Sequence, residues 1–136
     1  MEHSTSLEKL TVQNCDKLWN IQGLGQLTKL RIIHFGQCPQ IQELPGMEHL
    51  TFLEELTVRD CEKLQSIHGL RQLTNLQTLH VEECPEIRDL PGVEYLISLE
   101  ELTVLDCEKL QSIQGLRRLT KQLGQLTKRV GQFTNL

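Results

Sequence analysis

Residues 53–75 read LEELTVRDCEKLQSIHGLRQLTN, and the spacing of apolar residues in this stretch decides the fold. Counted from Leu53, an apolar residue or cysteine stands at positions 1, 4, 6, 9, 12, 15, 18 and 21. The opening Leu-x-x-Leu-x-Val alternates at its fourth and sixth positions, as expected of a short strand with one buried face. The three-residue spacings that follow suit tight turns and a short helical or 3-10 return. The stretch therefore predicts a strand followed by a return segment.

The same spacing recurs five times without insertion or deletion. The first positions are 23 residues apart, at Leu7, Leu30, Leu53, Leu76 and Leu99, and all forty apolar positions obey the rule. A single repeat cannot bury such a stripe alone, but stacked copies join the strands into one sheet and the stripes into one core. We therefore predict an α/β solenoid with a curved parallel sheet, one short strand per 23-residue repeat, and loop, 3-10 or short-helix returns on the convex side.

The motif Leu-x-x-Leu-x-Val-x-x-Cys resembles the leucine-rich-repeat signature, with cysteine where that signature has asparagine or cysteine. Residues 38–45 and 84–91 add Cys-Pro-x-Ile-x-x-Leu-Pro, which resembles the C-terminal repeat region of plant nucleotide-binding disease-resistance receptors. The resemblance covers about residues 7–121. It implies a non-catalytic protein–protein interaction module that serves ligand recognition or autoinhibition in a plant defence protein. The alternative is a substrate-recognition or scaffold subunit of a ubiquitin-ligase or signalling complex.

The repeat pattern divides the chain at residue 121. Residues 1–121 are predicted to form the leucine-rich-repeat domain, and residues 122–136 an irregular basic tail, because Gln122 stands where a sixth repeat would begin. Apolar residues from Leu116 to Phe133 follow spacings of three and four, which suits a helix. Three interpretations of the tail stay open: a C-terminal capping helix, a binding helix, and a duplicated segment without a role.

Charge is divided unevenly along the chain. Residues 1–108 hold all 18 acidic residues and eight basic ones, whereas residues 109–136 hold six basic residues and no acid. No apolar run is long enough to cross a bilayer, and the first residues lack the basic and apolar regions of a secretory signal. We predict a cytoplasmic or nuclear protein with no membrane partner. Only six residues precede the first repeat, so we also expect either self-association through uncapped ends or a longer parent protein.

The cysteines and histidines do not indicate a cofactor. The cysteines all occupy position nine of a repeat, where an inward thiol acts as a small apolar residue and weak donor: Cys15, Cys38, Cys61, Cys84 and Cys107. None forms a Cys-x-x-Cys pair. His34 and His80 lie two rungs and roughly 10 Å apart, too far to share one zinc ion. The sequence also lacks a phosphate-binding loop and a recognisable catalytic set, so we predict no metal, no cofactor and no enzyme activity.

Positions 2, 3, 5, 7 and 8 of each repeat are expected to face outward on or beside the strand, where solenoids usually hold a partner. Acids concentrate there in the later repeats, and like charges crowded on one face repel. A protein with a basic surface would relieve this repulsion, whereas the negative face disfavours nucleic acid. A merely solvated polar face is the alternative. The candidate protein-binding face consists of Thr11, Arg31, His34, Glu54, Glu55, Thr57, Arg59, Asp60, His80, Glu82, Glu83, Glu100, Glu101, Thr103, Leu105 and Asp106.

Overall fold

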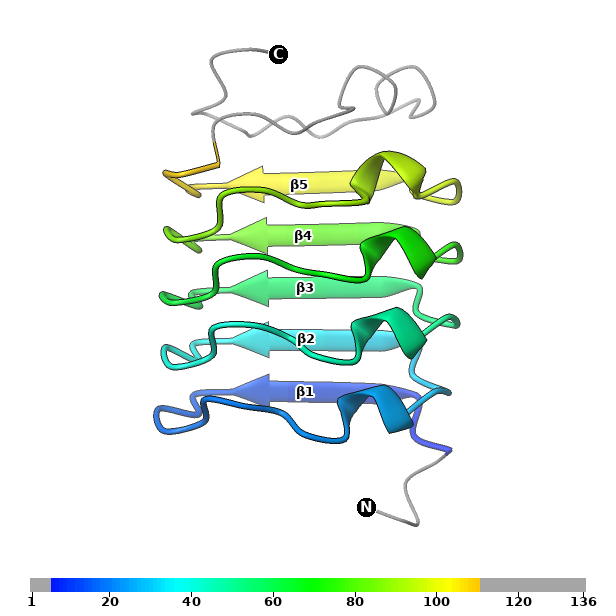
Figure 1. The fold of residues 1–136 in the computed structure, drawn as a ribbon, viewed down its shortest axis with the longest axis horizontal. Helices are drawn as coiled ribbons and strands as arrows, with labels where there is room; N and C mark the ends of the chain where they lie inside the picture. Colours follow the sequence, from blue (N-terminus) through cyan, green and yellow to red (C-terminus); the bar gives the residue numbers. More distant parts are fainter. Residues whose placement is uncertain (1–5, 111–136) are drawn as a thin grey trace.

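Within residues 6–110, five parallel strands lie side by side in chain order and form one sheet (Figure 1). The computed structural model describes residues 6–110. The strands are β1 (Lys9–Gln13), β2 (Ile32–Gly36), β3 (Glu55–Arg59), β4 (Thr78–Glu82) and β5 (Glu101–Leu105). Each residue of β1 to β4 pairs with the residue 23 positions later, as Leu10 does with Ile33 and Ile33 with Leu56. The predicted parallel-sheet solenoid is confirmed.

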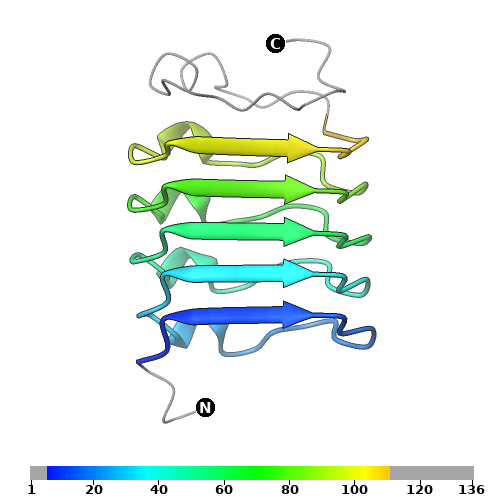
Figure 2. The same ribbon diagram turned by 180° about the vertical axis from the view of Figure 1, so that it is seen from behind.

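The return segments form a second layer, on one side of the sheet. Figure 1 shows their helical turns in front of the strands, and the view from behind shows the strands in front (Figure 2). In the part of the chain that the structure describes, these turns are four 3-10 helices: η1 (Leu24–Gln26), η2 (Met47–His49), η3 (Leu70–Gln72) and η4 (Val93–Tyr95). The prediction of 3-10 returns is therefore confirmed as well.

A glycine begins each of these 3-10 helices. Gly46 and Gly69 have φ values of 92° and 88°, a left-handed conformation that L side chains rarely adopt. A Cβ on Gly46 would lie 2.7 Å from the backbone nitrogen of Gly25, and one on Gly69 would lie 2.7 Å from that of Glu48. These glycines thus allow both the turn and the close approach of neighbouring repeats.

The core is a continuous stack of apolar side chains between the strands and the returns. From Leu24 to Leu110, the residues at the eight apolar repeat positions are all buried. The earlier members of the first repeat pack against this core but are only partly buried: Leu10, Val12, Cys15, Leu18 and Ile21. They form the outer side of the first rung in the described structure, so no second layer of leucines covers them there.

Each strand ends at a residue with left-handed backbone geometry. These position-eight residues have φ values of 51° to 57° and are Asn14, Gln37, Asp60, Glu83 and Asp106. The amide groups of the first four donate to the seventh residue of the next repeat, as Gln37 does to the Arg59 carbonyl at 3.0 Å and Asp60 to that of Glu82 at 3.0 Å. The turns therefore connect neighbouring rungs.

Two sequence predictions fall outside the described residues: the domain boundary at residue 121 and the basic tail at 122–136 with its capping helix. Within residues 6–110, no helix combines the length and the apolar character needed to span a membrane.

Candidate protein-binding face

The side chains at the third, fifth and seventh positions of the repeats form one surface over the sheet, which we call the strand face. They point away from the core because side chains alternate along a strand. The constant register lines up equal positions in rows across the five strands. The strand face consists of Lys9, Thr11, Gln13, Ile32, His34, Gly36, Glu55, Thr57, Arg59, Thr78, His80, Glu82, Glu101, Thr103 and Leu105.

A shallow depression lies on the strand face. It is lined by Gln13, His34, Phe35, Gly36, Glu55, Thr57, Arg59, Thr78, His80, Glu82 and Glu101. Seven of these residues were predicted from the sequence as part of the binding face, and the depression brings them together from four different strands. Its rim of carboxylates, imidazoles and hydroxyls offers both hydrogen-bond donors and acceptors to a partner.

Gly36 is a member of this depression that the sequence argument missed. It holds the seventh position of its repeat, where the neighbouring rungs carry Gln13 and Arg59. A Cβ there would meet the Gln13 side chain at 3.5 Å, an ordinary contact, so neither backbone geometry nor packing requires glycine. The glycine therefore leaves a gap in a row of long side chains. The interruption of that column in the sequence was the signal that could have revealed it.

Two histidines of the strand face contact a glutamate on the next strand. His34 Nε2 lies 2.7 Å from Glu55 Oε2, and His80 Nε2 lies 3.7 Å from Glu101 Oε2. Because a carboxylate only accepts, the short contact requires that His34 donate from Nε2. The two pairs are equivalent in the repeat pattern and lie two rungs apart.

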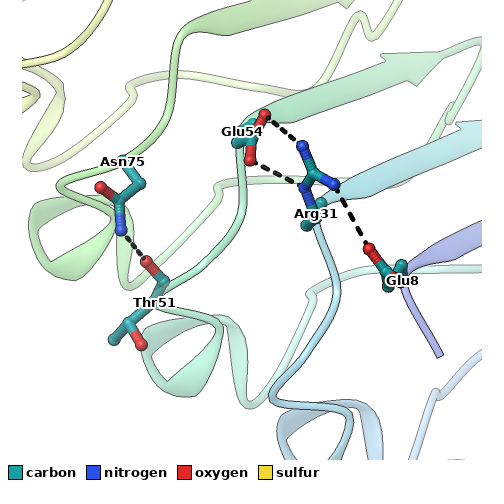
Figure 3. A network of polar contacts seen from close by, with 5 residues as sticks. All are labelled: Glu8, Arg31, Thr51, Glu54 and Asn75. Carbon is teal, nitrogen blue, oxygen red and sulfur yellow. Dashed lines mark hydrogen bonds and ion pairs between the residues drawn. The ribbon is translucent and has the colours of Figure 1, made fainter. Parts of the chain in front are cut away.

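Two arginines pair with further carboxylates that were predicted to repel one another. Arg31 donates from Nε to Glu54 Oε2 at 2.8 Å and from Nη1 to Glu8 Oε1 at 3.3 Å (Figure 3). Arg59 donates from Nε to Glu82 Oε2 at 3.1 Å. The hydrogen bond from Arg31 lowers the pKa of Glu54, and the same bond raises the pKa of Arg31.

The expectation of uncompensated acidic crowding is therefore wrong for Glu54 and Glu82, each of which pairs with an arginine. Glu54, Glu55, Glu82 and Glu101 each have a basic side chain within 4 Å, donated by the preceding repeat. The reason is the register, since a base at one rung lies beside the acid at the next. The two arginine pairs each share one repeat position, so their columns in the sequence signalled the contact, whereas each histidine at position five pairs with a glutamate at position three of the next repeat.

The position-eight carboxylates Asp60, Glu83 and Asp106 form a second, uncompensated row, which we call the acidic ladder. Among residues 6–110, none of the three has a basic side chain within ion-pair distance. A hydrogen bond with Asp60 raises the pKa of Glu83, and the charges of Asp60, Asp106 and Glu82 raise it further. A groove beside this ladder is lined by Asn14, Asp16, Gln37, Pro39, Asp60, Glu62 and Glu83.

The remaining predicted residues have different surroundings. Thr11 and Glu100 are exposed, and Leu105 is partly buried. Thr103 is a correction, because it is only 6% exposed although it was predicted to offer accessible surface. Its short side chain lies between Glu101 and Leu105 on β5 and beside His80 on β4.

The cysteine thiols serve the fold. Each Sγ donates to the carbonyl of the seventh residue of its own repeat, as Cys38 does to Gly36 at 3.4 Å and Cys84 to Glu82 at 3.3 Å. Burial raises the pKa of Cys38 and of Cys107, which keeps these thiols protonated. In the part of the chain that the structure describes, no three His, Cys, Asp or Glu side chains are grouped as metal ligands would be.

The stacked parallel strands with 3-10 returns define the chain as a leucine-rich-repeat solenoid. Solved structures with similar folds include the leucine-rich-repeat domain of the type III effector XopL, at 17% identity and a TM-score of 0.64, covering 95% of this chain and 66% of that one. An internalin, InlF of Listeria monocytogenes, is 18% identical with a TM-score of 0.33, covering 92% and 55%. The chain thus spans less than two thirds of either solved chain. No protein-family model and no curated protein sequence matches it. At such identity, the likeness to the effector domain shows the fold alone.

Proposed function

We propose that the chain is a non-catalytic recognition module that binds a protein with a basic surface through the strand face and the adjoining acidic ladder. The observation that carries this proposal is the acidic ladder itself: three carboxylates in neighbouring rungs, without basic partners among the described residues. The strand face beside it offers a polar, shallow depression of the kind that a partner's side chains can fill.

Electrostatics explains why the partner would be basic. Adjacent strands are about 4.8 Å apart, so the charges of the ladder stand close enough to repel. The raised pKa of Glu83 is a direct consequence of that repulsion and of the hydrogen bond with Asp60. Binding of a lysine- or arginine-rich surface would be favourable because it relieves the repulsion between these carboxylates. The ladder attracts such a surface over a distance of about one Debye length. Binding of this kind weakens as salt concentration rises.

We place this module in a plant defence protein, where it would recognise a ligand or hold the protein inactive. The support is the Cys-Pro-x-Ile-x-x-Leu-Pro motif at residues 38–45 and 84–91, which resembles the repeat regions of plant disease-resistance receptors. In such a setting the chemistry lies in other domains, and the solenoid supplies the contact surface.

A charge-matched comparison tests the basic-partner proposal. The ladder variant Asp60→Asn/Glu83→Gln/Asp106→Asn removes three negative charges from the ladder. The control variant Glu43→Gln/Glu48→Gln/Glu94→Gln removes the same charge from the return segments. We expect a deca-lysine peptide to bind the native chain in a salt-dependent manner, the ladder variant to bind about tenfold more weakly, and the control to bind nearly as well as the native chain. Equal weakening in both variants would reduce the effect to net charge and contradict the proposal.

The defence role needs a separate experiment. The native chain and the ladder variant are used to capture proteins from plant tissue, and those retained only by the native chain are identified by mass spectrometry. Receptor nucleotide-binding domains or pathogen proteins among them support the defence role. Ubiquitin-ligase subunits would instead support the scaffold alternative.

A further inference from the structure

A second pocket lies beside the strand face, next to the positions where the first strands begin. It is lined by Ser6, Glu8, Lys29, Arg31, Phe52 and Glu54, and we call it the side pocket. Most of its lining surface is apolar, and Phe52 is 52% exposed, although most large apolar side chains of the described residues are buried. An exposed aromatic ring in a hollow is a common feature of protein-binding surfaces.

Arg31 and the two carboxylates of the side pocket already satisfy one another. Arg31 donates from Nε and Nη2 to the two oxygens of Glu54, at 2.8 Å and 3.3 Å, and from Nη1 to Glu8 at 3.3 Å. Figure 3 shows the guanidinium held between the two carboxylates. With two acids and two bases, the pocket has no net charge at neutral pH. A cationic occupant would therefore lose hydration without gaining a free carboxylate, and no net charge attracts an anion into the pocket.

The arrangement favours a flat occupant. A guanidinium whose N–H groups donate in its plane keeps its planar faces for stacking, and the Arg31 side chain is 54% exposed. The Lys29 ammonium lies 5.5 Å from the centre of the Phe52 ring. An aromatic ring beside Phe52 would stack on it and offer its negative face to these two cations. An aliphatic side chain would gain only the burial of apolar surface.

The side pocket is specific to these rungs, although the repeats are near copies. In the next rung Glu54, Asn75 and Gln77 occupy the positions held here by Arg31, Phe52 and Glu54. Asn75 donates from Nδ2 to the Thr51 carbonyl at 2.7 Å, a polar contact in place of an open ring (Figure 3). Simple copying of repeats does not produce the side pocket.

We propose that the side pocket binds an uncharged aromatic side chain, of tyrosine or tryptophan type, presented by a peptide or protein partner. Lys29, Arg31 and Phe52 contact the ring, and Glu8 and Glu54 position the guanidinium. This anchor is distinct from the acidic ladder, which attracts positive charge. Either site can therefore fail without the other, because the ladder variant leaves every residue of the side pocket unchanged.

The test uses N-acetyl-tyrosinamide as the probe and N-acetyl-leucinamide as its aliphatic counterpart, with the Arg31 Nε–H resonance as the readout. We expect saturable ring-current shifts from the tyrosine probe, with a Kd on the order of 1 mM, and no comparable shift from the leucine probe. Phe52→Leu should weaken tyrosine binding about threefold or more while preserving the fold. Tyr95→Leu is the matched control, because Tyr95 is 43% exposed and stacks with Arg71 at 4.6 Å, outside the pocket.

Retained binding in Tyr95→Leu together with weakened binding in Phe52→Leu supports the proposal, and circular dichroism verifies that both variants fold. Three results would overturn it: no saturable shift with the tyrosine probe, equal affinity for the leucine probe, or equal losses in the two variants.

Discussion

The residues that follow the strands adopt an unfavourable backbone conformation, and their amide groups connect neighbouring repeats. A left-handed backbone costs an ordinary side chain roughly 1–2 kcal/mol, and asparagine and aspartate tolerate it best. Gln37 and Glu83 adopt it nonetheless, at φ values of 53° and 52°. The amide of each such residue reaches the next repeat, as that of Glu83 donates to the Leu105 carbonyl at 2.8 Å. The connection between rungs offsets the local strain.

Glu83 should make the stability of the solenoid depend on pH. Its pKa is raised in the folded state, so the folded chain holds this proton more tightly than the unfolded chain. The ionised form therefore destabilises the fold at neutral pH, and this destabilisation disappears as pH falls through the raised folded pKa towards the unfolded value of about 4.3. Glu83→Gln should raise Tm at pH 7 and have little effect at pH 4.

Thermal unfolding at both pH values measures this, with Glu43→Gln, an exposed acid of a return segment, as the control. Two results would contradict the destabilising effect of the Glu83 charge. One is a Glu83→Gln variant with the same Tm as the native chain at pH 7, and the other is an equal increase of Tm at pH 4 and at pH 7.

At the scale of the element, the glycine before each 3-10 helix is the residue on which the return depends. A Cβ at Gly69 or Gly92 would come within 2.8 Å of backbone in the preceding repeat, whereas one at Gly23 would lie 4.0 Å from the Gln26 side chain. All three share a φ near 90°, at 88°, 91° and 84°. Comparing them separates the strain of the turn from the contact between repeats.

Gly69→Ala should therefore destabilise the fold more than Gly23→Ala. Both alanines strain the backbone, but only the first must also displace the backbone of Glu48. We expect Gly69→Ala to cost about 1–3 kcal/mol more in the free energy of unfolding. Urea unfolding followed by circular dichroism measures the difference. Equal costs would show that left-handed geometry alone requires glycine here.

The strands were predictable from the sequence, because the alternation of buried and exposed residues is local and recurs five times in register. The requirement for glycine was less visible, although Gly23, Gly46, Gly69 and Gly92 all hold position seventeen of a repeat. A glycine at one repeat position signals positive φ or a close approach.

At the scale of the molecule, every repeat is stabilised by contact with its neighbours, so position along the stack determines what a core substitution costs. Leu56, in the third repeat, is fully buried, whereas the equivalent Leu10 in the first repeat is only partly buried. The two leucines hold the same position in their strands. They therefore form a matched pair that differs in packing.

Leu56→Ala should cost about 2–5 kcal/mol, the usual range for a buried leucine, because it leaves a cavity inside the stack. Leu10→Ala should cost less than half as much, since part of its surface already meets solvent. The free energy of unfolding in urea measures both. Similar losses at the two sites would contradict the gradient of packing along the stack.

The candidate site was only partly predictable, for a reason that belongs to the whole molecule. The sequence indicated which columns face outward, and most of the predicted residues do lie on the strand face or beside it. The contact of Arg31 with Glu8 and Glu54 was missed, although all three residues hold position two of successive repeats and their column signalled it. The sequence did not reveal the side pocket, which combines two different repeat positions from successive rungs.

The repetition of the histidine–glutamate contact has a consequence for the stoichiometry of ligand binding. His34 with Glu55 and His80 with Glu101 are the same motif shifted by 46 residues, or about 9.6 Å across the sheet. A short ligand that contacts a single histidine–glutamate pair would have two equivalent binding sites, so up to two ligand molecules would bind per chain. A ligand carrying two matching groups at that separation would occupy both at once, and its avidity would distinguish it from competitors that carry one.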